Sequence, residues 1–291
     1  MIEPGTPRVA VYLDFDNIVI SRYDQIHGRN SFQRDKTAGF HKAPGRLTTA
    51  TVDVGAIIDF ASSFGTLVLT KAYADWSADV NAEYRGQLVG RAVDLVQLFP
   101  AAAYAKNGAD IRLAVDAVED MFRLPDLTHV VIVAGDSDYI ALAQRCKRLG
   151  RYVVGIGITG SISRSLTAAC DEFVSYDALP GVPAATPDAA PKKRARRGKA
   201  QEPDEEPELP DPQAAATGLL ERALRIGHEK DDADWLHNSA VKAQMKRMDP
   251  SFSEKSLGFR SFSDFLRSRS DVVELDESST IRMVRLKTAA T

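Results

Sequence analysis

The sequence predicts an α/β protein, in which a parallel sheet flanked by helices is followed by a small α+β module similar to a winged helix. Two observations lead to this fold class. Short apolar runs rich in β-branched residues alternate with helical patterns over residues 7–179, and that alternation is typical of a parallel sheet with helices on both faces. After a stretch dominated by proline and charge, three helical patterns and a hairpin signal complete the chain.

The first strand is predicted in the stretch 8–17, RVAVYLDFDN. Its apolar run, residues 9–13, suits a strand that is buried on both faces. Asp14, Asp16 and Asn17 follow where that strand ends, and open α/β sheets bind ligands beyond the carboxyl ends of their strands. These three side chains are therefore candidates for a functional site. Capping of the next helix by Asp16 or Asn17 is an equally good interpretation.

A polar, turn-rich stretch comes next, HGRNSFQRDKTAGFHKAPGR, and no periodic pattern explains it. Long irregular loops in compact domains are usually either functional or disordered. Between Arg22 and Arg46 basic residues outnumber acidic ones by six to two, so we expect either a basic flap beside the site or a solvated insertion. The basic residues are Arg22, Arg29, Arg34, Lys36, Lys42 and Arg46.

Alternating elements then extend the sheet. Helical spacing over 53–64 is closed by Gly65, a favourable residue just after a helix. A strand at 67–73, a helix at 78–92 and a strand at 94–99 follow in turn. Strands separated by helices are expected to pair in parallel.

An amphipathic helix is predicted within 106–122, KNGADIRLAVDAVEDMF, and it opens near Asp110. A carboxylate in the first turn complements the helix dipole, so Asp110 also has a purely structural explanation. Asp116 lies six residues further on, rotated by about 240° on an ideal helix. The two carboxylates therefore cannot line one helix face equally well.

The stretch 128–150 repeats the opening stretch in form. A buried strand at 130–134 ends in Gly135, Asp136 and Asp138, and a helix follows. Glycine permits a sharp turn, and Ser137 or Asp136 can cap the helix. A single acidic pair after a strand is readily explained by capping, but two pairs after two buried strands are not. We regard this repetition as the strongest functional signal in the sequence.

The first domain is predicted to end near residue 179, after a strand at 151–158, a short helix and an edge strand at 172–176. Residues 180–212 are rich in proline, alanine and charge, with a basic block followed directly by an acidic one. Such a segment buries too little apolar surface to offset its ordering entropy, so we expect a disordered charged linker.

Residues 213–288 regain the pattern of a folded core. Helices are predicted at 214–226, at 234–248 and from 262 to 266, and VVEL and IRMVRL form a hairpin signal around DESST. Three helices and a terminal hairpin make a module similar to a winged helix. Its small size suits binding better than catalysis.

Composition excludes several classes of protein. Hydrophobic residues at 44% and charged residues at 26% are ordinary for a globular protein. No apolar run reaches the ~18 residues of a membrane span and no signal peptide is evident, so we expect a cytoplasmic location and no membrane partner. Cys146 and Cys170 have no zinc-like or disulfide-like spacing. A net charge of −3 means that any grip on nucleic acid must come from clustered cations.

The acidic candidates share one chemistry. Carboxylate and amide oxygens are the ligands that Mg²⁺ or Mn²⁺ prefers, and no soft ligand accompanies them. Clustered carboxylates repel one another unless protons or a cation compensate. A divalent ion could also lower the pKa of a bound water to create a nucleophile for a phosphodiester. The candidates are Asp14, Asp16, Asn17, Asp110, Asp136 and Asp138.

These motifs resemble the NYN family of PIN-like ribonucleases, through DFDN at 14–17, KNGAD at 106–110 and VAGDSDY at 133–139. The resemblance covers residues 7–179 and implies a PIN-like (Rossmann-like) sheet in a metal-dependent nuclease. It implies metal binding by Asp14, Asp110, Asp136 and Asp138, support from Asn17 and a secondary role for Asp116. Asp16 does not carry over from the family pattern.

The C-terminal module resembles a LOTUS domain, also called OST-HTH, through DPSFSEKSLGFRSFSDFL at 249–266 followed by VVEL. The resemblance implies binding of RNA, single-stranded or structured, or of a protein partner. Most of its aromatic residues are expected in the core, and the cations Lys255, Arg260, Arg267 and Arg269 are expected on the surface. The candidates for RNA contact in the whole chain are Arg22, Arg34, Lys42, Arg46, Lys255, Arg260 and Arg267.

Two alternatives stay open beside a metal-dependent ribonuclease. DFDNI also fits the nucleophile motif of haloacid-dehalogenase-type phosphatases, with Asp14 as nucleophile and Asp16 as acid. The chain could instead be a catalytically silent RNA-binding or scaffold protein. The phosphatase gives no role to KNGAD, and a silent protein would not need the full acidic set.

Overall fold

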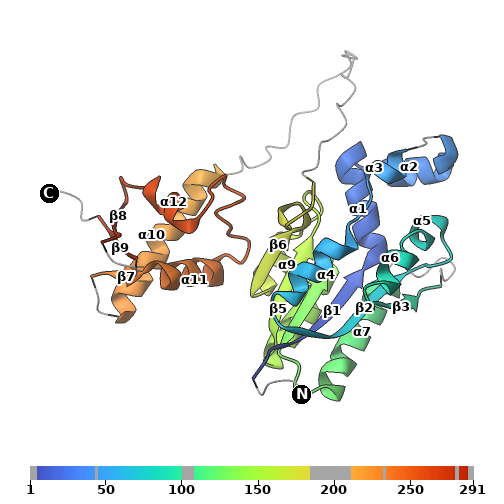
Figure 1. Ribbon diagram of the computed structural model, residues 1–291, viewed down its shortest axis with the longest axis horizontal. Helices are drawn as coiled ribbons and strands as arrows, with labels where there is room; N and C mark the ends of the chain where they lie inside the picture. The colour runs from blue at the N-terminus through green and yellow to red at the C-terminus, as the bar shows by residue number, and fades with distance from the viewer. Residues whose placement is uncertain are drawn as a thin grey trace, which may run out of the picture. The chain divides into compact units, whose positions relative to one another are not determined.

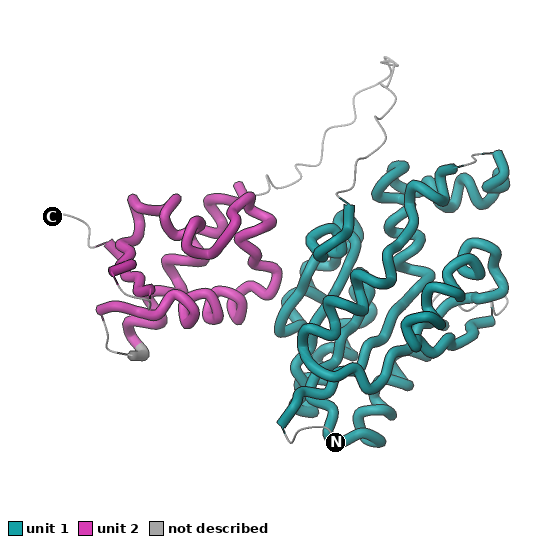
Figure 2. The backbone as a smooth tube through the Cα atoms, in the orientation of Figure 1, with its two compact units in different colours: residues 1–190 teal, residues 191–291 magenta. Residues whose placement is uncertain are grey.

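The computed structural model describes residues 5–42, 45–99, 108–183, 211–231, 234–278 and 282–287. The chain divides into two compact units, residues 1–190 and 191–291, shown in two colours in Figure 2. Most of the predicted linker, residues 184–210, lies outside the described residues. None of the described helices combines the length and apolar character that a bilayer-spanning segment needs.

The first unit contains a parallel sheet of six strands in the order β3-β2-β1-β4-β5-β6 (Figure 1). This order confirms the predicted α/β fold class. Chain order reverses between β1 and β4, which makes their carboxyl ends the topological switch point where such folds bind ligands. The strands are β1 Arg8–Asp14, β2 Thr66–Ala74, β3 Asp94–Gln97, β4 His129–Val133, β5 Tyr152–Gly157 and β6 Glu172–Ser175.

Helices cover both faces of this sheet, because the central strand is apolar on both. Val9, Val11 and Leu13 of β1 pack with residues of α1 and α4, whereas Ala10 and Tyr12 pack with residues of α7, α8 and α9. Each residue of the strand's apolar run is fully buried, as its sequence predicts. The helices are α1 Phe15–His27, α4 Val54–Ser62, α7 Gly108–Arg123, α8 Ile140–Arg148 and α9 Arg164–Ala169.

The predicted helix 78–92 is wrong in detail, because two short helices occupy it, α5 Asp79–Ala82 and α6 Arg85–Val89. The buried Asn81 side chain donates to the Asp16 carboxylate (2.6 Å) and to the Asp75 carbonyl, which ties α5 to the strand ends. Glycines within and after α6 also disfavour one continuous helix. The hydrogen bonds of Asn81 thus outweigh the local pattern that predicted one helix.

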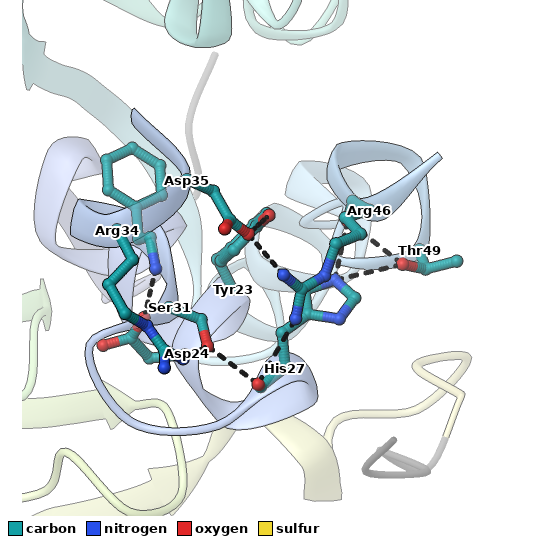
Figure 3. A network of polar contacts seen from close by, with 9 residues as sticks. Tyr23, Asp24, His27, Ser31, Arg34, Asp35, Arg46 and Thr49 are labelled. Carbon is teal, nitrogen blue, oxygen red and sulfur yellow. Dashed lines mark hydrogen bonds and ion pairs between the residues drawn. The ribbon is translucent and has the colours of Figure 1, made fainter. Parts of the chain in front are cut away.

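The polar stretch after α1 is helical, not irregular, and forms α2 Ser31–Ala38, the 3-10 helix η1 Phe40–Lys42 and α3 Arg46–Thr49. Figure 3 shows the polar network that holds it on α1. The Asp35 carboxylate accepts from the Tyr23 hydroxyl (2.6 Å) and from Arg46 (2.5 Å). Phe32 and Phe40 pack around the Tyr23 ring. A fully solvated insertion is therefore the wrong interpretation.

The second unit has the predicted three helices and hairpin around its own core. Its strands form an antiparallel sheet in the order β7-β9-β8. The predicted helix 234–248 starts later than expected, because Leu236 pairs with Val284 of β9 and the helix begins only at Asn238. The elements are α10 Pro212–Asp231, β7 Leu236–His237, α11 Asn238–Met248, α12 Phe262–Arg267, β8 Val273–Asp276 and β9 Met283–Leu286.

Candidate active site

Asp14 is the last residue of β1 and lies at the switch point of the sheet. Its side chain caps α1, since Oδ1 accepts from the Asn17 backbone N–H (3.3 Å). The capping function that the sequence left open to Asp16 or Asn17 thus belongs to Asp14. The residue is only 3% exposed, and among the described residues it forms no ion pair with a cation, which is unusual for a buried carboxylate.

A tyrosine hydroxyl joins Asp14 to Asp110. Tyr139 is fully buried, and its hydroxyl lies 2.9 Å from Asp14 Oδ2 and 2.8 Å from Asp110 Oδ1. A phenol has a single proton to donate, so two ionised carboxylates cannot both be satisfied by it. The arrangement therefore favours a further proton, shared by the two carboxylates, in addition to that of the phenol. The Asp14–Tyr139–Asp110 group is the centre of the candidate site.

Burial and mutual repulsion perturb both carboxylates. Removal from water raises the pKa of Asp14 to about 7, the Asp110 charge adds to the rise, and the Tyr139 hydrogen bond opposes it. Burial is also the main cause of the raised pKa of Asp110, to which the charges of Asp136 and Asp138 contribute. Perturbed carboxylates in one place at a strand edge are a recognised mark of functional sites.

The second acidic motif lies beyond the end of β4. Asp136 accepts from the Asp138 backbone N–H (3.3 Å) and caps the 3-10 helix η2 Ser137–Tyr139, which presents Tyr139 to the site. Asp136 is half-buried and Asp138 is exposed. Gly135 is required here, because a Cβ would lie 2.6 Å from the Ser161 carbonyl oxygen.

Asp16 and Asp116 serve other contacts. Asp16 accepts from the Asp75 backbone N–H (3.1 Å) as well as from Asn81, and so fastens the loop after β2. Asp116 accepts from the Tyr73 hydroxyl (3.1 Å) and from Arg112 (2.9 Å). Neither shows a hydrogen bond to the Asp14–Tyr139–Asp110 group.

A complete metal centre is not preassembled. Over the described ranges, no three histidine, cysteine or acidic side chains converge closely enough to hold one ion. The predicted ligand set of Asp14, Asp110, Asp136 and Asp138 therefore stays a prediction. Its donor chemistry fits Mg²⁺ or Mn²⁺, because all its atoms are oxygens and Mg²⁺ commonly binds through one or two carboxylates and keeps several waters.

In the first unit, two of the residues predicted to contact RNA have structural roles. Arg22 is buried, forms an ion pair with Asp177 (2.7 Å) and lies over the Tyr176 ring, so it cannot reach a phosphate. Arg46 is half-buried in the network of Figure 3, where it holds Asp35. Arg34 and Lys42 are exposed and stay candidates for RNA contact.

The cations of the second unit divide in the same way. Lys255 and Arg260 are exposed and form no ion pair within the described part of the chain. Arg267 is exposed but is paired with Asp264 (2.7 Å) and with Glu277 (2.8 Å). Arg269, expected on the surface, is instead buried over the Phe265 ring.

Sequence reasoning did not select Tyr139, although the residue ends the motif VAGDSDY. A usable signal was its position directly after a strand-end acidic pair. Tyrosine there is equally typical of a core position, and only the three-dimensional contact with Asp110 distinguishes the two.

Comparison with known proteins places these observations in context. A model of the NYN domain matches residues 8–177, and a model of the OST-HTH/LOTUS domain matches residues 207–285. No curated protein matches the chain. Among solved structures, the chain is similar to a protein of unknown function, VPA0982 from Vibrio parahaemolyticus RIMD 2210633. That similarity has 21% identity and a TM-score of 0.43, and covers 60% of this chain and 96% of the other.

Proposed function

The chain belongs to the NYN domain family, and on that premise we propose that it is a metal-dependent ribonuclease acting at the Asp14–Tyr139–Asp110 group. Its NYN and LOTUS domains make it a ribonuclease-like, RNA-associated protein. Catalysis, the divalent ion and the residues that bind it are the proposed steps. The observation that carries them is the convergence of two carboxylates from β1 and α7 on one buried hydroxyl.

In this proposal Asp14 and Asp110 hold the ion, with Asp136 and Asp138 adding negative charge beside them. Mg²⁺ or Mn²⁺ would supply a water of lowered pKa and positive charge opposite the phosphate. Its charge would also relieve the repulsion that raises the pKa of Asp110. The ion must displace the proton that the carboxylates share, so binding should strengthen as the pH rises.

The surrounding residues fix the orientation of these ligands. The Asn17 backbone N–H holds Asp14 Oδ1, which leaves Oδ2 turned to Tyr139. The Tyr139 hydroxyl in turn keeps Asp14 and Asp110 within reach of each other. Hydrogen bonds of this kind, made to ligands by residues that do not bind the ion, set ligand orientation in metal sites.

Phosphate contacts outside the site fall to exposed cations. Arg34 and Lys42 lie on the helical insertion of the first unit, and Lys255 and Arg260 lie on the second unit. Two RNA-binding parts on one chain raise the local concentration of RNA at the site. We propose that the LOTUS domain delivers RNA in this way.

The phosphatase alternative finds no support in the site. It needs Asp16 as a general acid, but both Asp16 oxygens accept hydrogen bonds that organise the loop after β2. The match to the NYN domain also covers the whole α/β unit.

The proposal is tested by a cleavage assay with the full chain on single-stranded RNA, structured RNA and DNA. Each substrate is incubated with Mg²⁺, Mn²⁺ or a chelator. Wild type is compared with Asp14→Asn and with the matched control Asp94→Asn. Asp94 is an exposed aspartate at the start of the edge strand β3. We expect RNA cleavage that requires a divalent ion, survives in the control and is lost in Asp14→Asn.

Two outcomes would contradict the proposal. Cleavage that persists both in chelator and in Asp14→Asn would exclude this site. RNA binding without cleavage in either metal, with the affinity unchanged in Asp136→Asn, would favour a silent RNA-binding protein.

The assigned cations are tested separately by RNA binding at several salt concentrations. Replacing Lys255 and Arg260 by alanine should weaken binding and lower the slope of log affinity against log salt, because each phosphate contact releases a counterion. Arg267→Ala is the matched control, since its charge is already neutralised by Asp264 and Glu277.

A further inference from the structure

Helix α7 has two apolar faces, and only one of them is buried. Leu113, Ala117 and Met121 pack into the core against the sheet. On the opposite side Ile111, Val115 and Phe122 are 64%, 57% and 70% exposed. The outer face of a surface helix is normally polar, so a row of large exposed apolar residues indicates an interaction surface.

The spacing of this row identifies the kind of partner. Ile111, Val115, Val118 and Phe122 follow one another at intervals of four, three and four residues. That is the alternation of d and a positions in a heptad repeat, the pattern by which one helix packs against another. Val118 lies in the same row; it is half-buried, packs partly against the core and exposes the rest of its side chain. The surface is therefore shaped for a second helix.

The charges beside the row favour α7 of a second copy. Arg112 and Glu119 occupy the two e positions on one side, and the g positions hold Ala114 and Met121. Within its own helix Arg112 also pairs with Asp116 and Glu119 with Arg123, so a contact across the interface would add to these surface pairs. In an antiparallel pair of helices, the e positions of one helix lie beside the e positions of the other. Arg112 would then lie opposite Glu119 of the partner subunit, and Glu119 opposite Arg112 of the partner subunit. Parallel helices would set both charges against uncharged residues. The helix is thus complementary to itself in the antiparallel orientation.

We propose that two copies of this chain associate through α7, with Ile111 packed on the partner's Phe122 and Val115 on the partner's Val118. The row spans about 17 Å of helix, so the interface belongs to the small class of weak or transient contacts. The fold already orders α7, so association carries no cost of forming the helix. A reversible dimer that depends on concentration is the expected result, and it goes beyond the nuclease activity proposed above.

The test is the molar mass of the full chain by analytical ultracentrifugation, from low to several hundred micromolar. Wild type should pass from monomer to dimer over this range. Val115→Glu should raise the dissociation constant by about tenfold or more, because it places a charge in the apolar row. Ile226→Glu is the matched control, since it makes the same kind of change at an exposed apolar residue of α10 and should leave association unchanged.

Charge reversal tests the antiparallel register. Glu119→Arg alone should weaken the dimer, and Arg112→Glu together with Glu119→Arg should restore it, since the pair is then reversed on both copies. Circular dichroism of each variant confirms that α7 is intact, because Arg112 also holds Asp116. A chain that stays monomeric throughout, a dimer that survives Val115→Glu, or a double reversal that fails to restore the dimer would each overturn the proposal.

Discussion

Two acidic motifs end neighbouring strands of the sheet, DFDN after β1 and GDSD after β4, and the fold treats them differently. Asp14 of the first motif is 3% exposed and is held by Tyr139, which comes from the second motif. Asp138 of the second motif is exposed. Similar sequences at equivalent strand ends therefore yield one buried carboxylate and one that faces water.

The difference arises from where each strand stops. Asp14 is itself the last residue of β1 and the N-cap of α1, so helix and sheet enclose it. Strand β4 stops at Val133, and the acidic residues that follow it lie further out, Asp136 as the N-cap of η2 and Asp138 within η2. Burial without a cationic partner costs stability, and it raises the pKa of Asp14. A carboxylate kept in such a place is a stronger functional candidate than an exposed one.

The largest expected effect is on catalysis. Asp14→Asn should reduce RNA cleavage by roughly 10²–10⁴-fold, the range typical for loss of a central catalytic group. Asp138→Asn should reduce it at least ~10-fold less, because the proposal gives Asp138 an electrostatic effect on Asp110 and no direct bond to the ion. Single-turnover rates of both variants in the same metal measure the gap. Equal losses would show that the buried and the exposed carboxylate contribute equally to cleavage, and would contradict this prediction.

Stability against pH is expected to change next most strongly. The pKa of Asp14 is raised to about 7 in the folded protein from 3.8, so the folded state holds the proton more tightly. Its stabilising contribution is present below pH 3.8 and is lost as the pH rises through 7. Relative to wild type, Asp14→Asn should gain roughly 2 to 3 kcal/mol of unfolding free energy between pH 5 and pH 8.

Urea denaturation in chelator at the two pH values checks this prediction. Asparagine is as good a helix N-cap as aspartate, so the substitution leaves the start of α1 intact. Asp94→Asn, at an exposed aspartate at the start of β3, is the matched control and should follow the wild-type pH profile. An Asp14→Asn profile parallel to wild type would mean that Asp14 is ionised throughout.

Much of the fold was predictable because its signals are local. The apolar run before Asp14 and the alternation of strands and helices sufficed for the parallel sheet. The polar stretch after α1 was not predictable, because its helices are held by hydrogen bonds between Tyr23 of α1, Asp35 of α2 and Arg46 of α3, and the spacing of residues within one helix does not encode contacts between helices. The start of α11 was mispredicted for the same reason, because the pairing of Leu236 with β9 makes it part of a strand and not of the helix.

The sequence selected the candidate residues, which stay a prediction, but it could not give their contacts. Asp14 was selected from its strand-end position, Asp110 from the first turn of a helix, and both from the resemblance to the NYN family. That Tyr139 links them depends on the distance between η2 and α7, which no local pattern encodes. Arg22 was misjudged because its ion pair is with the remote Asp177, which no local pattern reveals.

Tyr139→Phe tests the link between the two motifs with a smaller expected effect. Phenylalanine fills the same buried space but removes the hydroxyl shared by Asp14 and Asp110. Loss of a group that orients metal ligands typically costs 10- to 100-fold in metal affinity or activity. Metal titration of cleavage should therefore show a weaker apparent affinity. Tyr12→Phe is the matched control, because it removes a buried hydroxyl that binds Asp120.

Asp16→Asn should have the smallest effect, although Asp16 belongs to the same motif as Asp14. Asparagine keeps an oxygen that can accept from the Asp75 N–H, and only the contact with Asn81 is weakened. We expect a loss of about 1 kcal/mol in unfolding free energy and a change in cleavage of no more than a few-fold. Urea denaturation and cleavage rates measure the two. A loss of cleavage as large as that of Asp14→Asn would instead give Asp16 a direct chemical role. The burial of a carboxylate after β1 or β4 would then no longer predict its importance for cleavage.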